Sequence, residues 1–270
     1  MQELVEFLSS DNILPHISAF ALGSIRLLVF LSFAPFFGPS VTMAIKFPVL
    51  LALYLPLHPF LMSLNVILDL STMTGIVNLI VIILKETFIG FLLAFVIGNI
   101  FYIALGAGTI IDNQRGAAMA QGSDPLSGAE SSPLGNALFY AMVTLFFVSG
   151  AFLNFLNIFY STYVMWPPQI LLPGLMSSNM SLFAAIETDF LIEQAFLVAA
   201  PFILICLICD IALGLMNRFA PQLNVFILSM PIKSGVCAFL IIFYLGPFLN
   251  HAQSLFDHIA FLVNGISKIL

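Results

Sequence analysis

The stretch that decides the fold class begins at Ser131 and reads SSPLGNALFYAMVTLFFVSGAFLNFLNIFYSTYVMWPPQI through Ile170. No Asp, Glu, Lys or Arg occurs from Ser131 to Ile186. A helix needs about 20 predominantly apolar residues to cross a bilayer, so this uncharged run is long enough for more than one crossing. We therefore expect it to form helices that lie in a membrane or are buried by other protein.

The composition of the whole chain extends this expectation. Of the 270 residues, 61% are hydrophobic and 7% are charged, and the mean hydropathy is +1.13. Soluble domains carry about 25% charged residues, so a chain with this composition has too few charged residues to form a water-facing surface. A transmembrane β-barrel would alternate polar and apolar positions in short strands, whereas the apolar runs here are long and unbroken. The sequence predicts an all-α, polytopic integral membrane protein.

Apolar runs and the breaks between them predict roughly six to eight helices. The run over residues 76–111 exceeds one crossing and forms either one long tilted helix or two shorter ones. Two later runs flank a turn at residues 217–222, which predicts a helical hairpin over 190–250. The runs cover residues 13–37, 47–68, 76–111, 137–165, 190–217 and 223–250, followed by an amphipathic piece at 252–270.

Several charged residues lie inside these apolar runs. They are Arg26, Lys85, Glu86, Asp210 and Lys233. An isolated charge at the centre of a bilayer costs about 2.5–3.5 kcal/mol, so each is expected to face protein, water or a partner subunit. Asp210 and Lys233 lie on opposite arms of the hairpin, at similar distances from its turn near Arg218, and are expected to pair. Such a pair either holds subunits together, relays protons or ions, or faces a water-filled channel.

Other kinds of site are not indicated. The formal net charge is −6 and the chain has no basic cluster, so nucleic acid is not an expected partner. The histidines are dispersed near the ends of runs, and Cys206 and Cys209 have CxxC spacing in an apolar setting, so we expect packing cysteines and no metal site. No Ser/His/Asp set, HExxH or GxSxG motif occurs. We expect neither enzyme activity nor a cofactor.

The densest polar segment of the chain runs from Asp112 to Asn136. Its glycines do not form a nucleotide loop, because the third glycine of GxGxxG is missing and no βαβ unit surrounds it. The small residues that precede it, at positions 104 and 106–108, are expected to let another helix approach closely. The segment itself is either a solvated loop or a structured plug, since small residues and a methionine dilute its charge. The candidate plug residues are Asp112, Asn113, Gln114, Arg115, Gly116, Met119, Asp124 and Pro125.

Three motifs in this order resemble one known family. They are IDNQRGA at 111–117, DPLSG at 124–128 and LGLMNRFAPQLNVF at 213–226. This combination is similar to the T component of the bacterial type III secretion export gate, a relative of the flagellar export protein R. The first string and SMPIK at 229–233 resemble the injectisome branch, which serves virulence, more than the flagellar branch.

The resemblance implies an architecture and a set of partners. Residues 1–185 would form an R-type (flagellar P-like) helical region that contains the plug-like loop 112–136. Residues 186–270 would form an S-type (flagellar Q-like) hairpin with a terminal amphipathic segment. The implied partners are the R-type and S-type gate subunits, the U-type switch protein, the V-type export gate protein, unfolded substrate proteins and membrane lipid. The implied location is the bacterial inner membrane, with the assembly projecting to the periplasmic side.

The function that the sequence favours is therefore passive. The chain would be a gate subunit through which unfolded proteins cross the inner membrane, without chemistry of its own. The rival is an ion-coupled small-solute transporter in which Asp210 and Lys233 couple the ion. That class predicts inverted repeats with broken helices at matching positions, and no convincing repeat occurs in this sequence.

Overall fold

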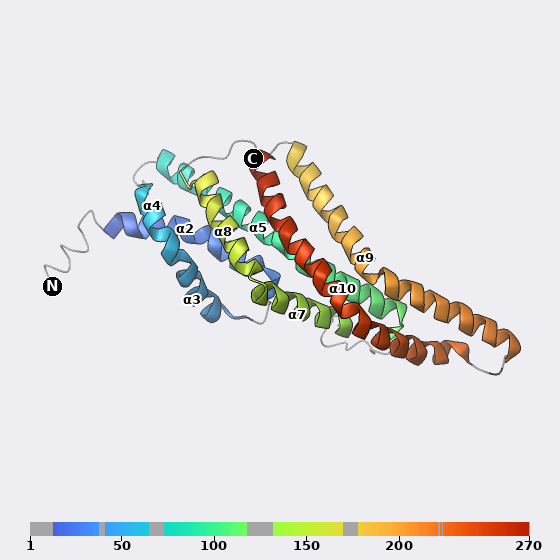
Figure 1. Ribbon diagram of the computed structural model, residues 1–270. Coiled ribbons are helices and arrows are strands. Elements are labelled where there is room, and N and C mark those ends of the chain that lie inside the picture. Colours follow the sequence, from blue (N-terminus) through green and yellow to red (C-terminus); the bar gives the residue numbers. More distant parts are fainter. Residues whose placement is uncertain are drawn as a thin grey trace. The chain divides into compact units, whose positions relative to one another are not determined.

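The computed structural model describes residues 13–37, 41–64, 73–117, 132–169, 178–220, 222 and 224–269. Within these ranges the regular structure is helical and contains no strand, which confirms the all-α prediction. The helices in Figure 1 are α2 (Ile13–Phe33), α3 (Met43–Tyr54), α4 (His58–Ser63), α5 (Met73–Gln114), α7 (Pro133–Val148), α8 (Ala151–Met165), α9 (Ser178–Phe219) and α10 (Val225–Ile269). Two 3-10 turns, η1 (Pro35–Phe37) and η2 (Leu55–Leu57), follow α2 and α3.

Proline and glycine set several of the helix boundaries. Pro56 lies in η2 and Pro59 in the first turn of α4, where proline is tolerated because the first N–H groups of a helix have no partner. The single apolar run over 137–165 is divided into α7 and α8. Gly150 lies between them with a φ of +79°, a conformation that glycine adopts without steric cost. Because Ser149 and Gly150 are a short interruption between long apolar stretches, hydropathy alone did not indicate this break.

Three helices are much longer than a membrane crossing requires. α5 is one continuous helix of 42 residues, which decides between the two alternatives for that run, while α9 has 42 residues and α10 has 45. The amphipathic piece expected at 252–270 is continuous with α10, which ends at Ile269, and its amphipathic character stays a prediction. At about 1.5 Å per residue each helix is longer than about 60 Å, against about 30 Å of hydrocarbon. Parts of each therefore extend beyond the hydrocarbon layer.

The contacts divide the chain into two compact units. The first unit takes its described residues from Met1–Gly98, Leu153–Ser181 and Ile259–Leu270, and the second from Asn99–Phe152 and Leu182–His258. The predicted boundary between residues 185 and 186 lies inside α9. That boundary concerns the R-type and S-type building plan of the family, which these units do not test, so it stays a prediction.

In the first unit, α2 packs against α3 and α4. Its core contains an aromatic cluster in which the ring of Phe30 lies 5.2 Å from that of Phe155 and 5.0 Å from that of Phe159, measured between centroids. All three side chains are almost completely buried. This cluster joins α2 to α8 and places the buried charges described below.

In the second unit, α9 and α10 form an antiparallel hairpin that turns between Phe219 and Val225 (Figure 1), as the sequence predicted. The ring of Phe146 on α7 lies 5.3 Å from Phe101 on α5 and 5.4 Å from Phe256 on α10. These contacts fix α7 between α5 and the hairpin.

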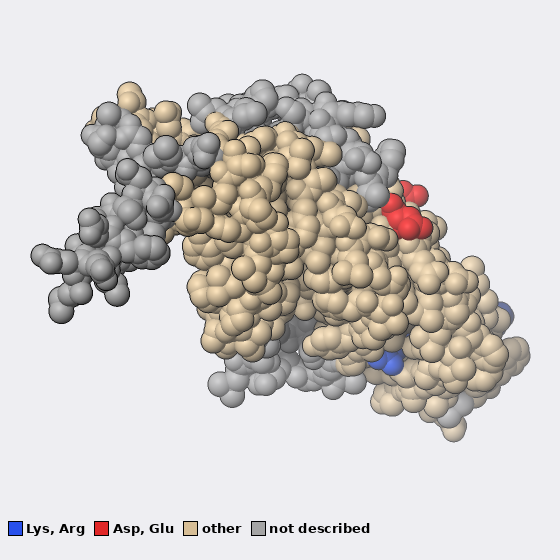
Figure 2. All heavy atoms as spheres, turned by 60° about the vertical axis from the view of Figure 1, so that its left-hand side comes forward, with Lys and Arg blue, Asp and Glu red and all other residues tan. Residues whose placement is uncertain are grey.

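The described helices have the length and composition of membrane spans. Five are long and apolar enough to cross a membrane, or up to six if α7 and α8 together form one broken span. Figure 2 shows a face on which charged side chains are few. The chain is a multi-pass membrane protein.

Candidate functional site: the clamped ends of the polar segment

The first residues of the predicted plug segment, Asp112 to Gln114, form the end of α5 and not a loop. Asp112 is buried, and its Oδ2 accepts hydrogen bonds from Ser132 Oγ at 2.6 Å and from the backbone N–H of Leu134 at 3.0 Å. Its Oδ1 lies 2.8 Å from Arg115 Nε and 2.7 Å from Arg115 Nη2. Both carboxylate oxygens of Asp112 are therefore occupied, and Asp112 and Arg115 form an ion pair at the end of α5.

The other end of the segment is the start of α7. Ser132 is its N-cap and accepts a hydrogen bond from the N–H of Gly135 at 2.9 Å, while Pro133 occupies the first helical position. Ser followed by Pro is a favourable helix start, and the negative charge of Asp112 is stabilised at the positive end of the helix dipole. We call the contacts of Asp112 with Arg115, Ser132 and Leu134 the loop clamp, because they join the described residues on either side of positions 118–131, where the sequence predicts a loop or plug.

Glycines allow α5 and α7 to meet at the clamp. A Cβ at Gly108 would lie 2.5 Å from the backbone nitrogen of Gly135, and one at Gly135 would lie 2.9 Å from the carbonyl oxygen of Leu105. Larger residues would push the two helices apart. A Cβ at Gly106 would come within 3.6 Å of the Cβ of Ala195 on α9. The predicted close approach of helices at these small residues is confirmed.

The second predicted cluster lies beside the clamp. Lys233 Nζ is 2.5 Å from Asp210 Oδ1, so the predicted pair across the hairpin forms. The same Nζ donates to the backbone oxygen of Gln114 at 3.4 Å, a carbonyl in the last turn of α5 that has no intrahelical partner. The side chain of Lys233 is 12% exposed and that of Asp210 is 45% exposed. Lys233 therefore ties the end of α5 to both arms of the hairpin, which the sequence did not predict.

Gly116 ends this region with a φ of +80°. Its N–H donates to the carbonyl of Asn113 at 3.1 Å, and a Cβ at Gly116 would lie 3.2 Å from Cγ of Met230 on α10. Glycine is favoured here both by the left-handed backbone and by the nearby methionine. Gly116 therefore makes a tight turn directly after α5.

The remaining predicted residues fall into two groups. Asn113 and Gln114 are exposed at the end of α5, and Arg218 is exposed in the last turn of α9, about two turns beyond Asp210. The structure thus does not bring Arg218 to the Asp210–Lys233 pair. Met119, Asp124 and Pro125 lie outside the described residues, so their role in a plug stays a prediction.

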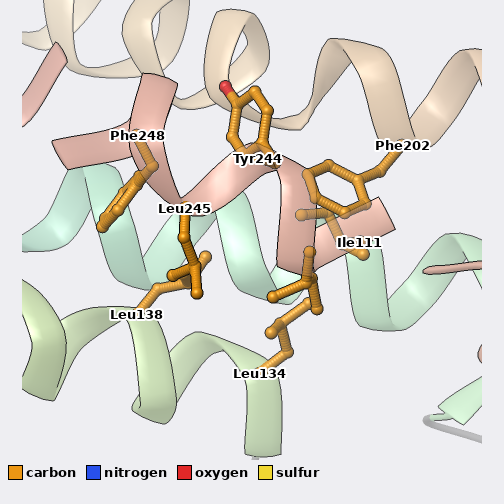
Figure 3. A pocket seen from close by; sticks show the side chains of 8 residues that line it. Ile111, Leu134, Leu138, Phe202, Tyr244, Leu245 and Phe248 are labelled. Carbon is orange, nitrogen blue, oxygen red and sulfur yellow. The ribbon is translucent and has the colours of Figure 1, made fainter. Parts of the chain in front are cut away.

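A small apolar hollow lies next to the loop clamp (Figure 3). Its volume is about 10 Å³, near the minimum for one water molecule, and its wholly hydrophobic lining favours a dry space. Figure 3 shows the hydroxyl of Tyr244 turned away from Leu134 and Leu138. The lining residues are Ile111, Leu134, Leu138, Phe202, Ile241, Tyr244, Leu245 and Phe248. The hollow is a seam between helices and offers no group that would hold a cofactor.

The first unit contains a buried cation that the sequence did not pair. Arg26 on α2 donates to Glu86 on α5 through Nε at 2.8 Å and Nη2 at 3.1 Å. Its other contacts are Thr162 Oγ1 at 2.8 Å, the carbonyl of Trp166 at 2.9 Å and the ring of Tyr163, whose centroid lies 4.1 Å from the guanidinium carbon. The expectation that charges in apolar runs face protein is confirmed for this pair.

Lys85 completes the same cluster. Its Nζ lies 3.1 Å from Glu86 Oε1 and donates to the carbonyl of Pro167 at 2.7 Å. Arg26 and Lys85 thus both reach the backbone just after α8, where carbonyls lack helical partners. The signal for pairing was present in the sequence as opposite charges in two different apolar runs, but nothing in it specified that α2 and α5 are neighbours.

Histidines also come together where the sequence indicated dispersion. His16 Nδ1 lies 3.0 Å from His58 Nε2, and His58 Nδ1 lies 2.7 Å from the hydroxyl of Tyr54. No group of three or more His, Cys, Asp or Glu side chains suited to a metal occurs among the described residues. Cys206 faces Cys237 across the hairpin, with Sγ atoms 3.5 Å apart.

Most of the chain matches one known protein family. The family described as bacterial export proteins, family 1, matches residues 17–259. This chain belongs to that family. The Yop proteins translocation protein T of Yersinia pestis is 36% identical to this export protein over 195 residues, which cover 71% of this chain and 74% of the relative.

Two further relatives are a surface presentation of antigens protein and a flagellar biosynthetic protein. The surface presentation of antigens protein SpaR of Salmonella typhimurium is 27% identical over 64% of each chain. The flagellar biosynthetic protein FliR of Bacillus subtilis is 31% identical over 58% of this chain and 61% of its own. The resemblance to the T component of the export gate is confirmed, and this export protein is a subunit of a type III secretion export apparatus. The small-solute transporter is not favoured.

Proposed function

We propose that this export protein is a passive gate subunit that forms, with R-type and S-type subunits, the inner-membrane pore for unfolded secreted proteins. The U-type and V-type components would be neighbours of this pore, which would project to the periplasmic side. Membership of the export family and the helices that exceed the hydrocarbon thickness support this proposal. In this role the subunit catalyses no reaction.

The loop clamp is the observation that carries the gating part of the proposal. Asp112 joins both ends of the loop between Gly116 and Ser132, and Lys233 joins α5 to the hairpin. A gate has to stop small ions at rest and open for a polypeptide, so its closing contacts should be individually modest and displaceable. A few hydrogen bonds of about 0.5–1.5 kcal/mol each, or about 1.5–3 kcal/mol to a charged group, meet that requirement. We infer that the clamp holds the loop as a plug.

The exposed faces of the hairpin support assembly with S-type hairpins. Large hydrophobic side chains line its outside and are exposed within the chain, so lipid or partner subunits have to cover them. On α9 they are Leu204, Leu207, Ile208, Ile211 and Leu215, and on α10 they are Ile227, Phe239, Ile242 and Phe243. Helix packing against similar hairpins would bury this surface.

Ion conductance tests the gating proposal. Shortening the loop between Gly116 and Ser132 should make membranes that carry the assembled complex leaky to small ions, with normal recovery of the complex. Asp112→Asn should give a smaller leak, because one amide oxygen does not replace two carboxylate oxygens that together bind three partners. Asn113→Ala, an exposed neighbour, is the matched control. Unchanged low conductance in the shortened variant, at normal yield, would show that the loop is a surface connection and that the seal lies elsewhere.

Co-purification tests the assembly role of the charge pair. Asp210→Ala or Lys233→Ala should lower recovery of the R, S and T subunits as one complex in mild detergent, since each leaves a charge without its partner. Exchanging the two residues should restore recovery only in part, because an Asp at position 233 has no donor for the Gln114 carbonyl. Normal recovery with secretion that has lost its dependence on the proton gradient would instead support a proton relay.

A further inference from the structure

A groove of about 70 Å³ opens between α2 and α3 in the first unit. Leu31 and Leu50 line it and are almost completely buried, whereas Met43 and Phe47 line it and are 62% and 54% exposed. The groove is therefore an apolar trough that is open at its rim. Lys46 is its one charged lining residue.

Lys46 has no acidic partner in the described part of this unit. Glu86 is the sole Asp or Glu among the described residues of the first unit, and Arg26 and Lys85 already contact its carboxylate. A half-buried lysine with no carboxylate partner among the described residues of its unit favours an anion supplied by the surroundings. The groove thus combines an apolar trough with a positive charge that no described carboxylate of this unit neutralises.

The position of Lys46 indicates which anion. It lies in the first turn of α3, close to the beginning of the candidate span Met43–Ser63. Lysine near the end of a span extends its ammonium toward the headgroup layer while its carbon chain stays on apolar surface. From the groove, Phe47 and Leu51 on α3 and Leu55 at the start of η2 follow at intervals of four residues and are all exposed. Such spacing places them on one side of the helix, as an apolar stripe that leads away from the charge.

We propose that this groove binds an anionic phospholipid. The phosphate contacts Lys46, the first part of one acyl chain enters between α2 and α3, and the rest of that chain follows the stripe on α3. The volume of the groove suits only a short part of an acyl chain, so the headgroup contact gives the preference for anionic lipid and the stripe gives apolar contact area. This proposal is independent of whether the polar loop acts as a plug.

The experiment uses the assembled complex purified in mild detergent and titrated with phosphatidylglycerol or phosphatidylcholine, with bound lipid counted by native mass spectrometry. We expect phosphatidylglycerol to be retained in preference to phosphatidylcholine. Lys46→Gln should lower the affinity of the complex for phosphatidylglycerol about fivefold, which is the effect of one lysine near an anionic lipid surface. Lys46→Arg should retain that affinity. Ser32→Phe, which fills the groove and leaves the charge unchanged, should also lower it. Arg218→Gln removes an exposed cation outside the groove and should have no effect.

Any of the following outcomes would overturn the proposal. Equal retention of both lipids would remove the role of the headgroup charge, and an equal loss in Arg218→Gln would show a general charge effect. Normal binding in Ser32→Phe would exclude the groove as the seat of the acyl chain. Displacement of the lipid by millimolar inorganic phosphate would point to a simple anion site. Capture of a neighbouring subunit by a photoreactive residue at Leu28, with no bound lipid, would assign the groove to a protein contact.

Discussion

At the scale of single residues, two cations and one anion are buried among the described residues of the first unit. Arg26 and Lys85 share Glu86, and all three side chains are at most 2% exposed. Removing the anion leaves two adjacent buried cations, whereas removing Lys85 leaves the Arg26–Glu86 pair intact. The three residues are therefore not equivalent, although each is a charge in an apolar run.

We expect Glu86→Gln to destabilise the subunit by about 3–5 kcal/mol, the usual effect of leaving a buried charge without its partner. Lys85→Met should cost no more than about 1–3 kcal/mol, because its main loss is the donor to the Pro167 carbonyl. Thermal unfolding of the complex in detergent measures both, with Lys46→Gln as a control cation outside the cluster. If Lys85→Met proved as harmful as Glu86→Gln, the unequal roles of the two residues would be refuted.

The same cluster shows the limit of prediction at this scale. Hydropathy identified Arg26, Lys85 and Glu86 as residues that need partners, and spacing from the hairpin turn paired Asp210 with Lys233. The contacts of Asp112 with Ser132 and of Lys233 with Gln114 depend on which helices are neighbours, and a single sequence does not specify that. The contact between His16 and His58 is not predictable from the sequence for the same reason.

At the scale of helices, close backbone approach distinguishes two glycines. Gly108 meets the backbone of Gly135, whereas Gly214 on α9 has no atom within 4 Å of the position that a Cβ would take. Gly108→Ala should separate α5 from α7 and weaken the loop clamp, which lowers the unfolding temperature of the complex. Gly214→Ala should raise the unfolding temperature slightly. The gain in the free energy of unfolding should be at most about 1 kcal/mol, because alanine favours the helix more than glycine does. A loss in both variants of similar size would contradict the assigned packing.

The hairpin can be tested with cysteines that the chain already has. Cys206 on α9 and Cys237 on α10 are buried with their Sγ atoms 3.5 Å apart, so a small movement brings them to bonding distance. Mild oxidation should form this disulfide, with two electrons and two protons passing to the oxidant, and mass spectrometry of the digested protein should detect the joined peptides. Cys209→Ser should not affect the link and Cys237→Ser should abolish it. A link from Cys209 in place of Cys206 would show a different register of the two arms.

Helix lengths explain why the boundaries were harder to predict than the helices themselves. The hairpin was expected over 190–250, but α9 begins at Ser178 and α10 ends at Ile269. Glu187, Asp189 and Glu193 lower the hydropathy of the first part of α9 without interrupting the helix. Helix formation depends on backbone hydrogen bonds and packing. A few polar residues therefore end the apolar run in the sequence although the helix continues through them.

At the scale of the whole molecule, the long helices restrict how the protein sits in a membrane. Val77 and Asn113 are exposed near opposite ends of α5, with 36 residue steps between them, or about 54 Å along the axis. Even at a tilt of about 40°, the upper end of the usual range, their separation along the membrane normal is greater than about 30 Å of hydrocarbon. At least one of the two positions therefore lies outside the hydrocarbon layer.

Cysteine labelling tests this placement. In a chain whose three native cysteines are replaced by serine, Val77→Cys or Asn113→Cys should react with a membrane-impermeant thiol reagent when vesicles expose the corresponding side. Phe91→Cys, which is exposed near the middle of α5, is the comparison position. A site covered by lipid becomes reactive after mild detergent extraction, whereas a site covered by a partner subunit stays protected in the intact complex. The placement of at least one end of α5 outside the hydrocarbon would be wrong under one outcome. In that outcome both end positions are protected in vesicles of either orientation and both become reactive on detergent extraction, because lipid then covers the full length of α5. Reaction at Phe91→Cys in vesicles would extend the result, since the middle of the helix would then also lie outside the bilayer, as expected of a gate that projects from the membrane.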